Sequence, residues 1–161
     1  MAEKIKVGIL LCGAHCAGCA GGKCFKAMRE RVGAFSPYQD KDVELELVGY
    51  GSCDHCFSGH MSPLLNQMQA QGAEVIYLAS GWICGYPPCP NISYIKKFIE
   101  QAHGLKVVVG THPIPTIFYN RHKMLGSWDS PEWQELIKPT LADEATRQAY
   151  DAAGEYAWRP Q

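Results

Sequence analysis

The chain has 161 residues, enough for one domain with its own hydrophobic core. Its 15 basic and 16 acidic side chains nearly cancel, so no positive surplus indicates a nucleic acid or an anionic membrane as a partner. No apolar run approaches the ~20 residues of a membrane span. The mixed charge of the first residues argues against a signal peptide, so we expect a cytoplasmic protein.

Four short apolar runs predict β-strands, at residues 5–11, 43–48, 75–79 and 105–109. The second run alternates apolar and acidic side chains, which is typical of an edge strand. The other three are nearly continuous, which is typical of strands buried on both faces. Strands that alternate with helices predict a parallel sheet, here in the order 2-1-3-4, covered by helices. The expected fold is therefore an α/β, flavodoxin- or Rossmann-like three-layer sandwich.

The helices between these strands are predicted from their ends and their apolar spacing. The first covers about residues 22–31. The others lie between residues 62 and 72 and between residues 91 and 104, with Ser62 and Asn91 as the expected N-caps.

Beyond residue 112 the pattern becomes helical. Two prolines, Pro113 and Pro115, exclude an interior strand at this point. Further along, Ser130 is expected to cap a helix, and Thr140 with Asp143 resembles a capping box for a last helix.

We therefore divide the chain into an α/β domain, residues 1–112, and a helical C-terminal extension, residues 113–161. Several aromatic side chains in the extension indicate that it packs on the domain or on a partner subunit, in the second case forming a homodimer. These residues are Trp128, Trp133, Tyr150, Tyr156 and Trp158.

The eight cysteines are the distinctive feature of the composition. Their share is below the ~8–10% typical of short disulfide-rich secreted chains, so they indicate metal or redox chemistry. None lies within a predicted strand, and each follows one. Cys12, Cys16, Cys19 and Cys24 follow the first strand, Cys53 and Cys56 the second, Cys84 and Cys89 the third, and His112 follows the fourth.

Because parallel strands end at one edge of a sheet, these residues are expected to converge there. Cys53 and Cys56 have the spacing with which two thiolates bind one tetrahedral ion, although such a pair would equally serve as a redox dithiol. Further ligands are available from Cys12, Cys16, Cys19, Cys89 and His112.

The other histidines are expected to have ordinary roles. His103 would place a positive charge at a helix C-terminus, and His60 and His122 are expected on the surface. His15 and His55 lie inside the cysteine motifs, where they would supply hydrogen bonds behind the ligands.

An ordered set of short motifs resembles the CGGC-domain family over about residues 4–112. The motifs are Cys12, Cys24-Phe25-Lys26-Ala27, Gly33-Ala34-Phe35, Ser52-Cys53-x-x-Cys56, Leu78-Ala79-Ser80, Pro88-Cys89-Pro90 and Gly110-Thr111-His112. Proteins of this family are described as binding a metal, zinc. The resemblance therefore implies a metal site formed by Cys12, Cys53, Cys56, Cys89 and His112.

Two positions depart from the family pattern. The Cys-Gly-Gly-Cys motif is here Cys53-Asp54-His55-Cys56. The cysteine that follows Leu-Ala-Ser in the family is Gly81, and a cysteine stands at Cys84 instead. Ligand assignment after the third strand therefore stays open.

Three functions of different classes remain. The first is metal binding, with zinc as the metal. The second is redox chemistry: Cys16, Cys19 and Cys24 with a fourth thiol, Cys84, would hold a [4Fe–4S] cofactor, or Cys53 and Cys56 would act as a dithiol. The third is a metal-free, flavodoxin-like binder whose glycine-rich stretch, residues 13–22, holds a phosphate. None of the three names a reaction.

Overall fold

The computed structural model describes residues 3–14, 16, 19–53 and 61–151. In chain order the elements are β1 (Glu3–Cys12), α1 (Gly22–Glu30), η1 (Gly33–Tyr38), β2 (Val43–Cys53), α2 (Met61–Ala70), β3 (Val75–Leu78), α3 (Gly81–Cys84), α4 (Ile92–His103), β4 (Lys106–Val109), α5 (Thr116–Leu125), α6 (Pro131–Ile137), η2 (Lys138–Thr140) and α7 (Glu144–Ala149). Within the described residues, none of the helices combines the length and apolar character that crossing a membrane requires.

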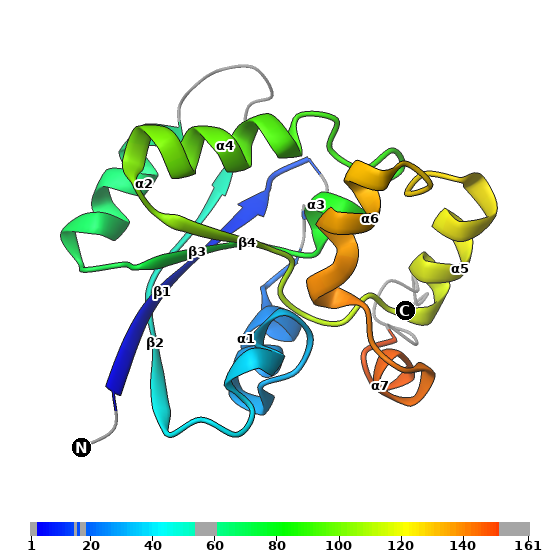
Figure 1. Cartoon of the computed structure of the whole chain (residues 1–161), viewed down its shortest axis with the longest axis horizontal. Coiled ribbons are helices and arrows are strands. Elements are labelled where there is room, and N and C mark those ends of the chain that lie inside the picture. The colour runs from blue at the N-terminus through cyan, green and yellow to red at the C-terminus, as the bar shows by residue number, and fades with distance from the viewer. Residues whose placement is uncertain (1–2, 15, 17–18, 54–60, 152–161) are drawn as a thin grey trace, which may run out of the picture.

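The four strands form one sheet in the order β2-β1-β3-β4, and every neighbouring pair is parallel. Figure 1 shows α2 and α4 on one face of the sheet and α1 on the other. This arrangement confirms the predicted α/β fold class and strand order. The alternating strand, β2, lies at an edge, where its acidic side chains can face water.

The interior of the sheet is apolar, as the sequence pattern predicts. All four residues of β3 are buried, and so are the last six residues of β1. Large side chains such as Ile9, Leu78 and Trp82 are almost completely removed from water. Burial of this kind stabilises a fold by roughly 25 cal/mol per Å² of apolar surface. The two central strands, β1 and β3, therefore form the stable core on which the strand ends are placed.

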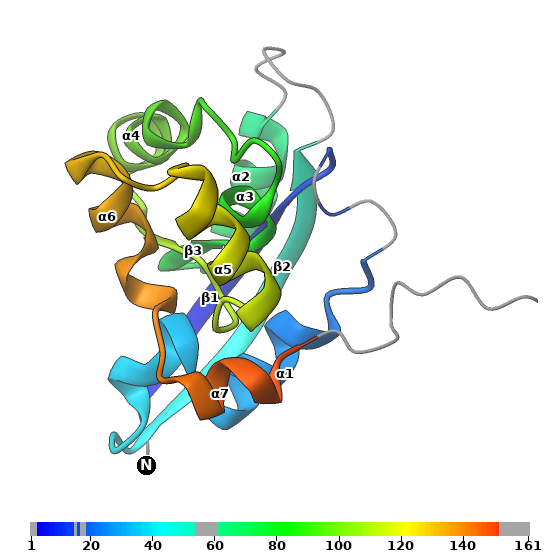
Figure 2. The ribbon, with the colours of Figure 1, turned by 90° about the vertical axis from the view of Figure 1, so that its right-hand side faces the viewer.

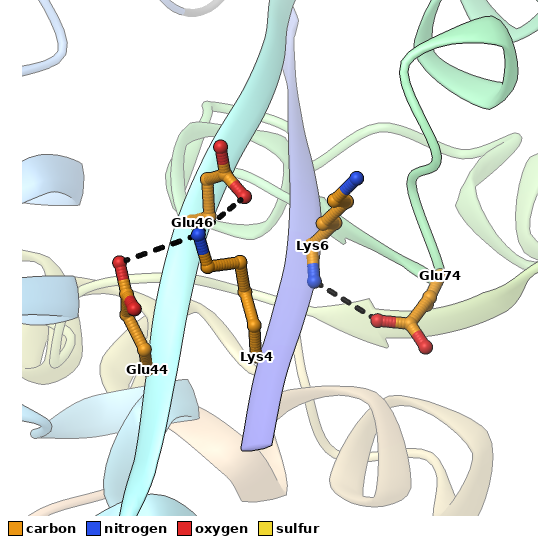
Figure 3. A network of polar contacts seen from close by, with 5 residues as sticks. All are labelled: Lys4, Lys6, Glu44, Glu46 and Glu74. Atoms are coloured by element: carbon orange, nitrogen blue, oxygen red, sulfur yellow. Dashed lines mark hydrogen bonds and ion pairs between the residues drawn. The ribbon is translucent and has the colours of Figure 1, made fainter. Parts of the chain in front are cut away.

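Charged side chains lie near the amino end of the sheet (Figure 3). The Lys4 ammonium lies 3.9 Å from a carboxylate oxygen of Glu44 and 3.6 Å from one of Glu46. The backbone N–H of Lys6 donates a hydrogen bond to the Glu74 carboxylate at 3.0 Å. Both partners of the Lys4 ion pairs are exposed, so each pair contributes about 0–1 kcal/mol.

The first two strands are longer than predicted. They continue to Cys12 and Cys53, so these two cysteines are the last residues of strands rather than loop residues. A four-residue helix that was not predicted, α3, follows β3 and contains Cys84.

The expected helix caps are partly wrong. Ser130 and Asp143 each accept a backbone N–H at the start of α6 and α7. In contrast, α2 already begins at Met61, so Ser62 lies inside the helix. Thr140 is in η2 and its hydroxyl donates to a carbonyl of the preceding turn, so it forms no capping box with Asp143.

The helices after β4 return to the α/β part of the chain (Figure 2). The indole N–H of Trp128 donates to the carbonyl of Ile83 at 3.0 Å, and the Tyr150 hydroxyl donates to the Glu30 carboxylate at 2.8 Å. Both aromatic side chains are buried. Two other aromatic residues of the extension, Tyr156 and Trp158, lie outside the described residues.

Candidate functional site

Two cysteines end neighbouring strands side by side. Cys12 is the last residue of β1, Cys53 is the last residue of β2, and the register of the two strands pairs them directly. The N–H of Gly13 donates to the Cys53 carbonyl at 2.9 Å, which keeps the strands joined at their carboxyl ends. Directly opposed residues project to the same face of a sheet, so the two thiols share one face.

A pocket of about 320 Å³ lies at the same edge of the sheet, beyond the ends of β1, β3 and β4. The Lys23 side chain contributes a positive charge to its wall, and Tyr86 with Phe118 contributes an aromatic pair whose ring centroids are 5.9 Å apart. The predicted site residues that line this pocket are Cys16, Cys19, Cys24, Cys84 and His112. Segments far apart in the sequence therefore meet around one cavity.

Burial keeps three of the pocket thiols protonated. Removal from water raises the pKa of Cys16 and that of Cys84 to about 12, and the pKa of Cys24 to about 11. The hydroxyl of Thr111 beside Cys24 and the charge of Lys23 near Cys84 oppose this effect without cancelling it. At neutral pH these thiols are neutral, so a metal ion would have to displace their protons.

The ring of His112 is held in one orientation. Its Nδ1 lies 2.8 Å from the carbonyl oxygen of Pro113, and because a carbonyl only accepts, Nδ1 carries the proton. The lone pair is then on Nε2, as in a histidine that ligates a metal. The ring is stacked parallel to that of Tyr150, with the planes at 4° and the centroids 6.1 Å apart.

Two buried hydroxyl groups join the ends of β3 and β4. The Ser80 hydroxyl donates to the His112 carbonyl at 2.7 Å and accepts the Thr111 N–H at 3.1 Å. The Thr111 hydroxyl oxygen accepts the Ser80 N–H at 3.2 Å and lies 3.1 Å from the Cys24 sulfur. Neither residue has any exposed surface. The pair therefore positions two of the pocket residues, His112 and Cys24.

The expectation that His122 lies on the surface is wrong. It is completely buried between the rings of Tyr86 and Trp128, at centroid distances of 4.8 and 4.4 Å. Its Nε2–H donates to the Cys84 carbonyl at 2.9 Å, while Nδ1 has no hydrogen-bond partner among the described residues. Burial lowers the pKa of His122, so the ring is neutral. Its Nε2–H is then a hydrogen-bond donor that holds the end of α3 at Cys84.

Cys89 is not among the residues that line the pocket. It is buried beyond α3, where its N–H donates to the Trp82 carbonyl at 2.9 Å. The indole N–H of Trp82 in turn donates to the carbonyl of Leu10 on β1 at 2.9 Å. Cys89 is therefore connected to the sheet through the carbonyl and the indole of Trp82.

One predicted ligand, Cys56, lies outside the described residues, as do His15, His55 and His60. Within the described part of the chain, no group of three Cys, His, Asp or Glu side chains is arranged to hold a metal ion. The pair formed by Cys12 and Cys53 would therefore need a further donor from elsewhere, and Cys56 is the next thiol along the chain.

The fold and the site define a parallel α/β protein whose sheet carries thiols along its carboxyl edge. Residues 6–112 match the model of the CGGC domain, so the chain belongs to the CGGC-domain family. It is also similar to an uncharacterized protein of Methanocaldococcus jannaschii, with 34% identity over 122 residues that make up 68% of this chain and 88% of that protein. No solved structure matches the chain.

Several residues of the site were not predicted. Ser80 and Thr111 have a signal in the sequence, because both belong to the short motifs that resemble the family. Tyr86 and Phe118 have none, since they come from a loop and from α5 and meet only in the folded chain.

Proposed function

We propose that the chain binds a thiophilic metal ion, zinc, at the carboxyl edge of its sheet. The observation that carries this proposal is the in-register pair of Cys12 and Cys53 at the ends of β1 and β2. Cys56 follows Cys53 at the spacing of a two-cysteine metal clip and would supply a third thiolate. Thiolates favour zinc or iron–sulfur clusters over hard cations such as magnesium.

His112 and Cys89 are the candidates for the fourth position. Either side chain would have to move closer to Cys12 and Cys53, because no three such side chains among the described residues are arranged to hold a metal ion. The hydrogen bond from Nδ1 of His112 to the Pro113 carbonyl leaves Nε2 as the ligating atom. The hydroxyls of Ser80 and Thr111 fix the backbone from which this ring projects. Four protein ligands would make a closed, structural site, whereas three with one open position would make a site able to activate a bound water.

An iron–sulfur cluster is the second candidate function, and one observation favours it. Cys16, Cys19, Cys24 and Cys84 line a single pocket, and four thiolates are the usual ligand set of a [4Fe–4S] cluster. No three of these described thiols are arranged to hold a metal ion, so a cluster would have to draw them closer together. A cluster there would use different cysteines from the proposed zinc site, so substitutions separate the two.

The test is the metal content of the full-length chain purified without oxygen. Zinc, iron and sulfide are measured in the wild type, in Cys53→Ser and in Cys19→Ser. Cys19→Ser is the matched control because the Cys19 thiol is exposed and lines the pocket, outside the proposed zinc ligands. Circular dichroism shows whether each variant is folded.

We expect a colourless protein with one zinc per chain, lost in Cys53→Ser and kept in Cys19→Ser. Zinc that survives in a folded Cys53→Ser variant would refute the proposal. A coloured wild type that contains iron and sulfide, and loses both its colour and its iron in Cys19→Ser, would favour the iron–sulfur cluster over zinc.

A further inference from the structure

Cys19 is an accessible thiol beside the start of a helix. It is exposed, and its sulfur accepts the backbone N–H of Gly21 at 3.4 Å. Gly21 is the N-cap residue of α1, where the helix dipole and the unpaired N–H groups favour negative charge. Reactive cysteines are typically accessible to solvent, as Cys19 is.

A second thiol lies within bonding reach of Cys19. The N–H of Cys19 donates to the Cys16 carbonyl at 2.9 Å, which holds these two residues next to each other. Two residues three apart in sequence that share such a bond have their Cα atoms within about 7 Å. Disulfides join Cα atoms roughly 4.4–6.8 Å apart, so the separation of Cys16 and Cys19 is compatible with a disulfide. Cys16 is partly buried, and both thiols line the same pocket.

We propose that Cys19 and Cys16 form a redox-active dithiol that exchanges with anionic low-molecular-weight disulfides entering the pocket. Cys19, as the exposed thiol, attacks first, and Cys16 resolves the mixed disulfide from its more protected position. This function goes beyond metal binding and uses cysteines outside the proposed zinc set.

The exchange balances without a further oxidant. The Cys19 thiolate attacks one sulfur of a disulfide RSSR, forming a bond to RS and expelling the other half as RS⁻, which takes up a proton. Cys16, which burial keeps neutral at rest, gives up its proton only as its sulfur attacks the Cys19 sulfur and expels the second RS⁻, which takes up that proton. The sum is two protein thiols plus RSSR giving one protein disulfide plus two RSH, so the protein is oxidised by two electrons and RSSR is reduced.

The charge of the pocket selects the class of disulfide. Lys23, in the first turn of α1, lines the pocket together with Cys16 and Cys19. A positive charge inside a cleft raises the local concentration of anions, so a disulfide that carries carboxylates should react faster than a cationic one.

The experiment uses the full-length chain, purified without oxygen and treated with oxidised glutathione or with the cationic disulfide cystamine. Free thiols are counted, and the modified cysteines are located by peptide mass spectrometry. In the wild type we expect the count to fall from eight to six, with the new bond between Cys16 and Cys19. Cys16→Ser should accumulate glutathione on Cys19, and Cys19→Ser should react at neither position.

Ser93→Ala is the control, because Ser93 is on α4, does not line the pocket and should leave the exchange unchanged. Lys23→Gln should slow the reaction with oxidised glutathione several-fold while leaving that with cystamine unchanged. A disulfide between other cysteines, or glutathione elsewhere in Cys16→Ser, would overturn the proposal. Iron and sulfide bound through Cys16 and Cys19 would overturn it as well, whereas loss of zinc in Cys53→Ser bears only on the zinc site.

Discussion

Replacing Ser80 by alanine should destabilise the fold far more than the size of one hydroxyl group suggests. The Ser80 hydroxyl is completely buried, donates to the His112 carbonyl and accepts the Thr111 N–H. Its removal leaves the buried Thr111 N–H and the partly buried His112 carbonyl without their partner. Each such group costs about 1–3 kcal/mol, so we expect a loss of about 2–6 kcal/mol in the free energy of unfolding.

Urea unfolding followed by circular dichroism measures this loss. With a urea dependence of about 2 kcal/mol per M, the midpoint should fall by roughly 1–3 M at an unchanged slope. Ser93→Ala is the matched control, because the Ser93 hydroxyl donates to Glu132 at an exposed position. The free energy of unfolding of Ser93→Ala should differ from that of the wild type by no more than about 0.5 kcal/mol.

The reasoning is refuted if Ser80→Ala unfolds at the same urea concentration as Ser93→Ala. That result would mean that water or a backbone shift satisfies the Thr111 N–H and the His112 carbonyl at little cost. The junction of β3 and β4 would then not depend on the hydroxyl of Ser80.

Two further predictions concern His122 and Gly33. Burial lowers the pKa of His122, so at acidic pH the unfolded chain binds a proton that the folded chain excludes. The free energy of unfolding should therefore decrease as the pH falls below about 6.5, by up to ~1.4 kcal/mol per pH unit. His122→Gln, which keeps a neutral donor, should remove this dependence in urea titrations across that range, and an unchanged slope would contradict the assignment. Gly33→Ala should lower the thermal midpoint, because at φ 61° its Cβ would lie 2.5 Å from the Thr111 carbonyl oxygen. Gly22→Ala, with open space around the new methyl group, should not, and equal midpoints would count against the contact.

The sheet was predictable because burial leaves a strong signal in the sequence. The continuous apolar run of β3 corresponds to a strand buried on both faces. The equally apolar run of β4 was expected to be buried in the same way, but β4 lies at an edge and only Val107 and Val109 are buried. Parallel topology then brings the strand ends to one edge. The gathering of Cys16, Cys84 and His112 around one pocket follows from these two facts.

The details of the site were less predictable, because they depend on contacts between distant segments. His122 was expected on the surface since helical spacing alone does not reveal that α5 turns this side chain between Tyr86 and Trp128. The helix α3 is too short to show a period, so its effect on Cys84 was missed. The separation of Cys89 from the pocket likewise depends on how α3 is placed.

The short helix α3 depends on a part of the chain that the CGGC-domain match does not include. Its carbonyl groups at Ile83 and Cys84 receive hydrogen bonds from Trp128 and His122, which lie beyond residue 112. A chain cut at that residue would lose both donors and, with them, the anchor of one wall of the pocket. When segments are exchanged between members of the family, α3 and the helices beyond residue 112 should therefore be transferred together.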